Sequence, residues 1–192
     1  VHKQGETLDG KPLMGKPLIL EPFQVFIVVN LLGWYYTGTN IRRFKEAFIM
    51  LARKNGKTTL IAGIAWAVGI IQRRSGSVIY MVANALKQTL QAFNFLKFSI
   101  EYRKLDQTFD IKDNIFEHSI KYQFRKPDGT PDGTLEIQAM PANPDRQDSF
   151  NSNFTIADEV AAYKNPAQYN RFKEAGKAYT NKMIVGITTA GD

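Results

Sequence analysis

Two short stretches of this 192-residue sequence carry side chains that suit phosphate chemistry. One is the polar segment Arg53-Lys54-Asn55-Gly56-Lys57-Thr58 and the other is the acidic pair Asp158-Glu159, and each follows an apolar run. In a glycine-containing loop, backbone N–H groups can surround phosphate oxygens, a lysine can reach the terminal phosphates and a hydroxyl can bind Mg²⁺. The first stretch therefore predicts a nucleotide site in which Lys57 contacts phosphate and Thr58 holds the metal.

The match to the P-loop pattern G-x-x-x-x-G-K-[ST] is incomplete, because Leu51 stands where the pattern has its first glycine. Gly-Lys-Thr also occurs by chance, and the alternative interpretation is a basic helix start. The flanking sequence favours the P-loop. Residues 47–52 form an apolar run short enough for a buried strand, and residues 57–72 are almost entirely apolar and lack proline, as in a helix packed on a sheet.

The acidic pair supplies what a P-loop alone lacks. Phosphoryl transfer requires a metal, a group that orients the attacking water and positive charge at the γ-phosphate. Residues 154–157 predict a buried strand, which would place Asp158 beside the P-loop at its carboxyl end. We therefore predict that Asp158 holds Mg²⁺ together with Thr58, and that Glu159 orients or deprotonates water. The alternative is an ordinary boundary between a strand and a loop.

These residues need a sheet to position them. Residues 78–83 form another apolar strand after the predicted helix, and two buried strands joined by a helical crossover imply parallel pairing. The sequence thus predicts an α/β fold with a mostly parallel central sheet and helices on both faces. Further expected elements are a helix (or else a strand) over 22–34, a helix capped by Asn84 that ends near Arg103, short strands over 115–118, 120–124 and 134–140, a helix from Asn165 to about Gly176, and a strand over 182–188.

The N-terminal segment differs from the rest of the chain. Residues 1–20 contain three glycines and two prolines among polar residues, so they predict an irregular arm outside the core, followed by one domain over residues 21–192. Just before the first strand, Arg42, Arg43 and Lys45 are expected on a solvated edge.

The composition narrows the function classes. A hydrophobic content of 44% suits one folded domain, and the absence of cysteine with only two distant histidines argues against disulfides and structural zinc. No apolar run reaches membrane-spanning length, so we expect a soluble intracellular protein. The net charge of +7 favours a polyanionic partner such as nucleic acid.

The motifs together resemble one family, the ATPase domain of the large terminase subunit of tailed double-stranded DNA bacteriophages, which drives the genome into an empty capsid. In that family the first P-loop glycine is replaced and a basic residue lies inside the loop, as here. The resemblance covers most of the chain and rests on Leu20–Gln24, Ala52–Thr58, Thr155–Glu159 and Ile187–Gly191.

The resemblance implies roles for individual residues. Gln24 would contact adenine, Arg53 would sense the γ-phosphate in cis, and Arg146 is the nearest match to an arginine that acts in trans. The bland alternatives are a surface glutamine, a solvated loop arginine and, for the coupling residues, a plain strand end. The implied sets are ATP-binding Gln24, Arg53, Lys54, Asn55, Gly56, Lys57, Thr58 and Thr59; catalytic Glu159, Arg53 and Arg146; and coupling Thr188, Thr189 and Gly191.

The resemblance also implies a P-loop NTPase with an additional strand between the P-loop and acidic strands and a catalytic glutamate. Its expected activity is Mg²⁺-dependent ATP hydrolysis that translocates viral double-stranded DNA into the procapsid, in the host cytoplasm and not in the mature virion. Expected partners are DNA, the portal protein, the small terminase subunit and other copies in a ring, by resemblance a pentamer, whereas the isolated domain would be monomeric. A nuclease domain would lie beyond Asp192. The alternatives are a helicase-like translocase and a nucleotide-binding, DNA-anchoring module without turnover.

Overall fold

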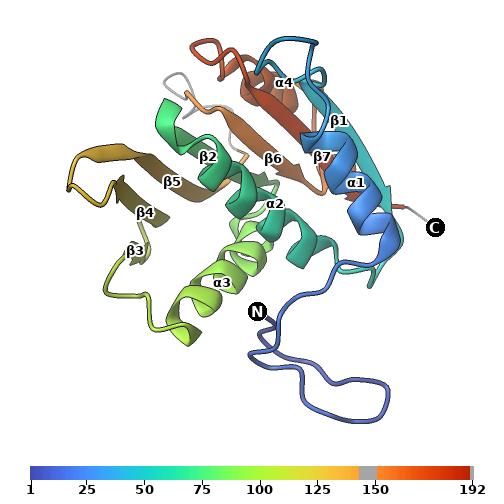
Figure 1. The fold of residues 1–192 in the computed structure, drawn as a ribbon. Helices are drawn as coiled ribbons and strands as arrows, with labels where there is room; N and C mark the ends of the chain where they lie inside the picture. Colours follow the sequence, from blue (N-terminus) through green and yellow to red (C-terminus); the bar gives the residue numbers. More distant parts are fainter. Residues whose placement is uncertain (143–150, 191–192) are drawn as a thin grey trace.

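The computed structural model describes residues 1–142 and 151–190. Their helices and strands form an α/β fold around one seven-stranded sheet with the strand order β1-β7-β6-β2-β5-β4-β3 (Figure 1). The elements are α1 (Pro22–Leu32), β1 (Glu46–Leu51), α2 (Lys57–Ile71), η1 (Arg73–Ser75), β2 (Ser77–Ala83), α3 (Leu86–Tyr102), β3 (Asp110–Asp113), β4 (His118–Arg125), β5 (Pro131–Pro141), β6 (Phe154–Asp158), η3 (Val160–Ala162), α4 (Pro166–Glu174) and β7 (Met183–Thr189).

The sheet is mostly parallel. Strands β1, β7, β6, β2 and β5 run in one direction, and β4 and β3 continue the sheet as an antiparallel ribbon. Strand β7 lies between β1, which leads into the predicted P-loop, and β6, which ends in the acidic pair. The predicted fold class is therefore confirmed, including the strand inserted between the P-loop strand and the acidic strand.

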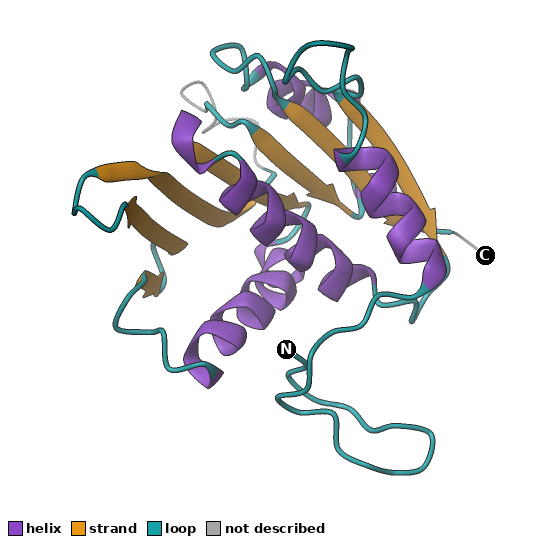
Figure 2. Ribbon diagram, viewed as in Figure 1, coloured by secondary structure: helices purple, strands orange, loops and turns teal. Residues whose placement is uncertain are grey.

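Helices cover both faces of the sheet, but unequally (Figure 2). Helices α1, α2 and α3 lie on one face, and α4 lies on the other. Because side chains alternate along a strand, Ile79 of β2 packs into the larger core and Tyr80 packs into the smaller one with Phe172 of α4. Gly69 allows α2 to approach the sheet closely, since a Cβ there would lie 2.3 Å from Leu135 Cδ1.

Several local expectations were wrong. Asn84 does not cap α3: the N-cap is Ala85, whose backbone N–H donates to Gln88 Oε1 at 3.2 Å. The expected strand over 115–118 is mostly a turn, because Asn114 Oδ1 accepts from the backbone N–H groups of Phe116 and Glu117. The alternating residues there satisfy their backbone through this side chain, and β4 begins only at His118.

The segments before the sheet also differ from expectation at two points. The N-terminal arm contains only an isolated bridge between Glu6 and Pro12, yet Leu18 and Leu20 at its end pack against the core. Arg42 is 2% exposed, so its predicted place on a solvated edge was wrong. Asn181 Oδ1 accepts from its backbone N–H at 2.8 Å and holds this residue inward. Within the described residues, no helix has both the length and the apolar character needed to cross a membrane.

Candidate nucleotide site

The residues predicted to bind and hydrolyse nucleotide lie at the ends of three neighbouring strands. In the parallel register of the sheet, Leu51 of β1 lies opposite Thr189 of β7, and Asp158 of β6 lies opposite Ile187 of β7. The segment after β1 therefore emerges at the same edge as the acidic pair. Parallel strands bring functional loops together at their carboxyl ends in this way.

The loop of residues 52–56 turns sharply into α2. Lys54 and Gly56 adopt left-handed backbone conformations with φ of 67° and 69°. Glycine accepts this conformation without strain, whereas Lys54 adopts it at some cost. The backbone N–H groups of residues 53–59 donate to no other described group. Together with the positive end of the α2 dipole, these free donors form a surface suited to phosphate oxygens.

Lys57, the first residue of α2, links this loop to the acidic strand. Its Nζ lies 3.0 Å from Asp158 Oδ1 and also donates to Glu159 Oε1. The Lys57 side chain is only 11% exposed, so water screens these ion pairs weakly. One ammonium thus faces two carboxylates, and this group of three side chains carries a net charge of −1 when all three are ionised.

The two carboxylates experience different surroundings. Asp158 is 6% exposed, and burial raises its pKa despite the opposing hydrogen bond and charge of Lys57. Burial would also raise the pKa of Glu159, but the hydrogen bond and charge of Lys57, with hydrogen bonds from Thr189, outweigh it and lower the pKa. Glu159 is less buried, which is why its partners prevail. It is held as an anion, as a general base requires.

Glu159 is also fixed in position. Its φ of 50° is left-handed and rare for a residue with a side chain, and such strain persists where surrounding contacts hold it. Its Oε2 accepts from Thr188 Oγ1 at 3.3 Å, from Thr189 Oγ1 at 3.2 Å and from the Thr189 backbone N–H at 3.4 Å. Two predicted coupling residues therefore contact the predicted base directly.

Gln24 lies at the P-loop rather than on an open surface. It is 6% exposed, its Oε1 accepts from the Glu21 backbone N–H at 3.0 Å, and its Nε2 donates to the Asn55 carbonyl at 3.4 Å. The same amide thus caps α1 and restrains the phosphate loop. Its contact with Asn55 was not foreseen, although a glutamine in the first turn of a helix that starts with proline is a signal for the cap.

The donors predicted for a magnesium ion are the Thr58 hydroxyl and the Asp158 carboxylate. Mg²⁺ commonly binds one or two protein oxygens together with substrate phosphates and water, so this small donor set fits it. Among the described residues, no group of three or more His, Cys, Asp and Glu side chains could hold a metal.

The remaining predicted residues fall into three groups. Arg53 and Lys54 are exposed on the loop. Asn55 Nδ2 donates to the Ala52 carbonyl at 3.4 Å, and Thr59 Oγ1 donates to the Gly56 carbonyl at 2.8 Å, so both side chains shape the loop. Arg146 and Gly191 lie outside the described residues.

The sequence matches the family model "Terminase large subunit, ATPase domain" over residues 22–192. The chain belongs to this family. No curated protein matches it. Among solved structures, the HK97 bacteriophage large terminase is similar with a TM-score of 0.71 and 23% identity, over 91% of this chain and 34% of that one.

Other terminases share the fold. The ATPase domain of the Thermus phage P74-26 large terminase has a TM-score of 0.55 and 18% identity, over 90% of this chain and 71% of that one. The large terminase of the thermophilic bacteriophage D6E in complex with ATP-γ-S has a TM-score of 0.60 and 12% identity, over 84% of this chain and 36% of that one. This terminase ATPase domain thus spans about a third of the HK97 and D6E chains.

Proposed function

We propose that this domain hydrolyses ATP with Mg²⁺ and that hydrolysis drives double-stranded viral DNA into a procapsid. The observation that carries the proposal is the position of Lys57, which directly follows a loop of free N–H groups and forms ion pairs with both Asp158 and Glu159. A phosphate cradle, a metal ligand and a base meet there. The D6E terminase has been solved with both ADP and ATP-γ-S, which supports ATP as the ligand.

The geometry supports a sequence of side-chain roles. The loop N–H groups bind phosphate oxygens, and Lys57 exchanges its carboxylate partners for the β- and γ-phosphates. This exchange leaves the Asp158 carboxylate free, so Asp158 and Thr58 would hold a magnesium ion, which would supply charge neutralisation at the phosphates. Glu159, still held by Thr188 and Thr189, accepts a proton from the attacking water.

Positive charge at the γ-phosphate comes from Arg53 in cis and, in the assembled motor, from Arg146 of a neighbouring subunit. Arg53 is exposed on the loop and free to turn toward a bound nucleotide. Hydrolysis changes the contacts of Glu159. Thr188 and Thr189 of β7 contact Glu159 directly, so this change is transmitted to β7. Gly191 follows these two residues in the chain. We assign coupling between chemistry and motion to this segment.

The partners in this proposal are the DNA, the portal protein, the small terminase subunit and further copies of the chain in a ring, in the host cytoplasm. The isolated domain is expected to be monomeric and slow, because the trans arginine is missing from its site. Such an arginine contributes about 10³-fold or more in rate.

Multiple-turnover phosphate release and DNA packaging by the full-length protein test the proposal. Parent protein should do both, while Glu159→Gln should bind ATP and do neither. Normal turnover by Glu159→Gln would show that the base is another residue. Failure of the parent to turn over would leave only a nucleotide-binding module.

Mixed rings test Arg146 separately. A subunit with Arg146→Ala and an intact P-loop should regain hydrolysis when its neighbour carries Lys57→Ala but retains Arg146. If Arg146→Ala alone leaves packaging-coupled hydrolysis unchanged, the trans role belongs elsewhere.

A further inference from the structure

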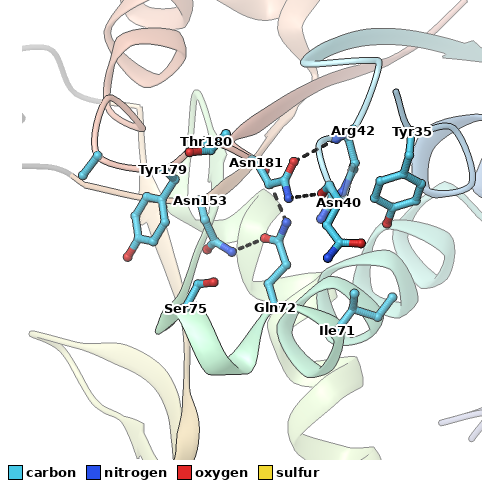
Figure 3. A pocket seen from close by; sticks show the side chains of 11 residues that line it. Tyr35, Asn40, Arg42, Ile71, Gln72, Ser75, Asn153, Tyr179, Thr180 and Asn181 are labelled. Atoms are coloured by element: carbon cyan, nitrogen blue, oxygen red, sulfur yellow. Dashed lines mark hydrogen bonds between the residues drawn. The ribbon is translucent and has the colours of Figure 1, made fainter. Parts of the chain in front are cut away.

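A cavity of about 560 Å³ lies at the amino ends of the central strands (Figure 3). Lys57 lies at the other end of these strands. The cavity walls come from four separate places in the chain. Arg42 precedes β1, Gln72 ends α2, Asn153 precedes β6 and Asn181 precedes β7. Cavities of this volume accommodate small organic ligands.

Arg42 is the unusual member of this wall. The residue is 2% exposed, and its Nη1 is buried without a hydrogen-bond partner. Across residues 1–142 and 151–190, none of the ion pairs includes Arg42. Burial lowers the pKa of Arg42, and the nearby Tyr35 hydroxyl opposes this shift in part. A buried guanidinium without a counter-charge is costly unless something else compensates it.

The amide side chains beside Arg42 form a fixed wall (Figure 3). Asn181 Nδ2 donates to the Asn40 carbonyl at 2.7 Å, Gln72 Nε2 donates to the Asn181 carbonyl at 3.3 Å, and Asn153 Nδ2 donates to Gln72 Oε1. Three further lining side chains make no hydrogen bond to another described residue and remain available to a ligand: Asn40, Ser75 and Thr180.

Arg42 carries the one charged side chain among the described lining residues, and burial and the charge of Glu136 raise the pKa of another lining residue, Tyr179. No aspartate or glutamate is among its described lining residues. Lys45 Nζ donates to the carbonyl of Thr180, a lining residue. Burial lowers the pKa of Lys45, and the nearby charges of Arg42 and Lys182 lower it further. Lys45 thus lies close enough to Arg42 and Lys182 to be repelled by both, and an anion would relieve this repulsion.

We propose that this cavity binds a phosphate group, free or carried on a molecule of nucleoside monophosphate size, with Arg42 as its main ligand. A guanidinium donates two parallel hydrogen bonds to phosphate oxygens, and the uncompensated cations favour a dianion over a carboxylate. Because Nη1 is buried, phosphate binding requires the guanidinium to turn into the cavity that Arg42 lines. The Tyr35 ring and Ile71 are then positioned to contact the rest of the ligand.

Thermal unfolding of the full chain tests this site, in a Lys57→Ala background so that phosphate at the P-loop does not contribute. Inorganic phosphate, compared with chloride at equal ionic strength, should raise Tm with the logarithm of its concentration, by about 5–10 °C at 100 times Kd. Arg42→Met should abolish the shift while leaving the phosphate-free Tm near that of its parent, because it removes an unpaired buried charge. The exposed neighbour provides the matched control, and Arg43→Met should retain the shift.

Further ligands identify the source of the phosphate. Deoxyadenosine monophosphate binding more tightly than inorganic phosphate, with deoxyadenosine silent, would indicate an organic phosphate, and equal affinities would indicate free phosphate. An equal shift with acetate would overturn the phosphate assignment. An unchanged shift in Arg42→Met would overturn the site itself. Should Arg42→Met fail to fold, Asn40→Ala and Thr180→Val should each weaken phosphate binding about 3- to 10-fold, and unchanged affinity in both would overturn the proposal.

Discussion

Lys57 and Arg42 are two shielded cations at opposite ends of the strands of one sheet, and they differ in the charge of the side chains around them. Lys57 has two carboxylates and lies beside a loop with free N–H donors. Arg42 has no carboxylate and lies beside a wall of amides. A cation paired with carboxylates, such as Lys57, can exchange them for phosphate. In the proposed function the released carboxylates would then bind a metal or accept a proton. An uncompensated cation favours any anion that reaches it.

This difference also separates stability from function. Removing one partner of a buried ion pair leaves the other charge unpaired, whereas removing an already unpaired charge does not. Deleting the cation should therefore lower Tm at Lys57 and leave Tm nearly unchanged at Arg42.

The largest effect is expected for Lys57→Ala. It leaves Asp158 and Glu159 without their cation and removes the proposed contact with the terminal phosphates. Turnover should fall by about 10³-fold or more, nucleotide affinity should fall strongly, and Tm should drop. Phosphate release, calorimetric titration with ATP-γ-S and thermal unfolding measure the three. Lys97→Ala is the matched control, since Lys97 pairs with Asp113 far from the site. ATP binding at parental affinity would contradict the assignment.

Glu159→Gln should lower turnover by about 10²- to 10⁴-fold and leave ATP-γ-S binding within a few-fold of the parent. The amide keeps the shape of the side chain but cannot take a proton from water. Glu136→Gln, which changes a carboxylate on β5, controls for the loss of one negative charge. Equal losses in binding and turnover would indicate a structural role for Glu159 instead.

Gln24→Ala should weaken ATP binding about 10-fold, because the loop loses its restraint at Asn55 and the adenine ring loses its proposed amide partner. Competition between ATP and GTP distinguishes these two causes. If Gln24 contacts adenine, the preference for ATP should shrink; if it only restrains the loop, both affinities should fall together. Gln123→Ala on β4 provides the control.

Thr189→Val should reduce turnover about 3- to 10-fold with little change in nucleotide affinity. The substitution removes the 3.2 Å hydroxyl contact with Glu159 but keeps the backbone N–H donor. Combining Thr189→Val with Glu159→Gln should add almost nothing to the effect of Glu159→Gln alone. Additive losses in this double-mutant cycle would mean that the threonine acts independently.

The smallest effect is expected on the stability of the fold, from Glu117, a carboxylate with hydrogen-bond partners that lies outside both sites. Hydrogen bonds from Ser119 and Lys112 lower the pKa of Glu117 from 4.5 to about 2. Because this pKa is lowered on folding, the carboxylate stabilises the fold above pH 4.5 and loses this effect as pH falls toward 2. Glu117→Gln should cost about 0.5–1 kcal/mol at pH 7, since water screens the pair. Urea unfolding at pH 7 and pH 3 should show a smaller difference at the lower pH.

Local patterns predicted most of the fold. Continuous apolar runs indicated β1, β2, β6 and β7, and their order with α2 indicated a parallel sheet. The errors lie where contacts between distant residues decide the outcome. Arg42 is charged and belongs to a basic cluster, yet Asn181, 139 positions away, holds its backbone inside the molecule. No periodicity in the sequence reports such a contact.

The sequence predicted the site at the carboxyl ends of the strands much better than the cavity at their amino ends. At the carboxyl edge, Lys57, Asp158 and Glu159 could be grouped because motifs place them at adjacent strand ends, and the structure brings them together. Their roles remain predictions. At the amino edge, the lining residues come from four separate segments without a shared motif, so only the three-dimensional structure brings Arg42 beside Asn181.

Strand β1 has one more property, which concerns handling rather than chemistry. It is the last strand on its side of the described sheet, so one row of its backbone N–H and C=O groups has no partner strand. Phe48 and Met50 lie on the same face of the sheet as α4, but α4 does not cover them, and each is 59% exposed. An unpaired, apolar edge is a template for another strand. Concentrated solutions of this chain should therefore scatter more light with time, and a lysine at Phe48 should suppress this growth.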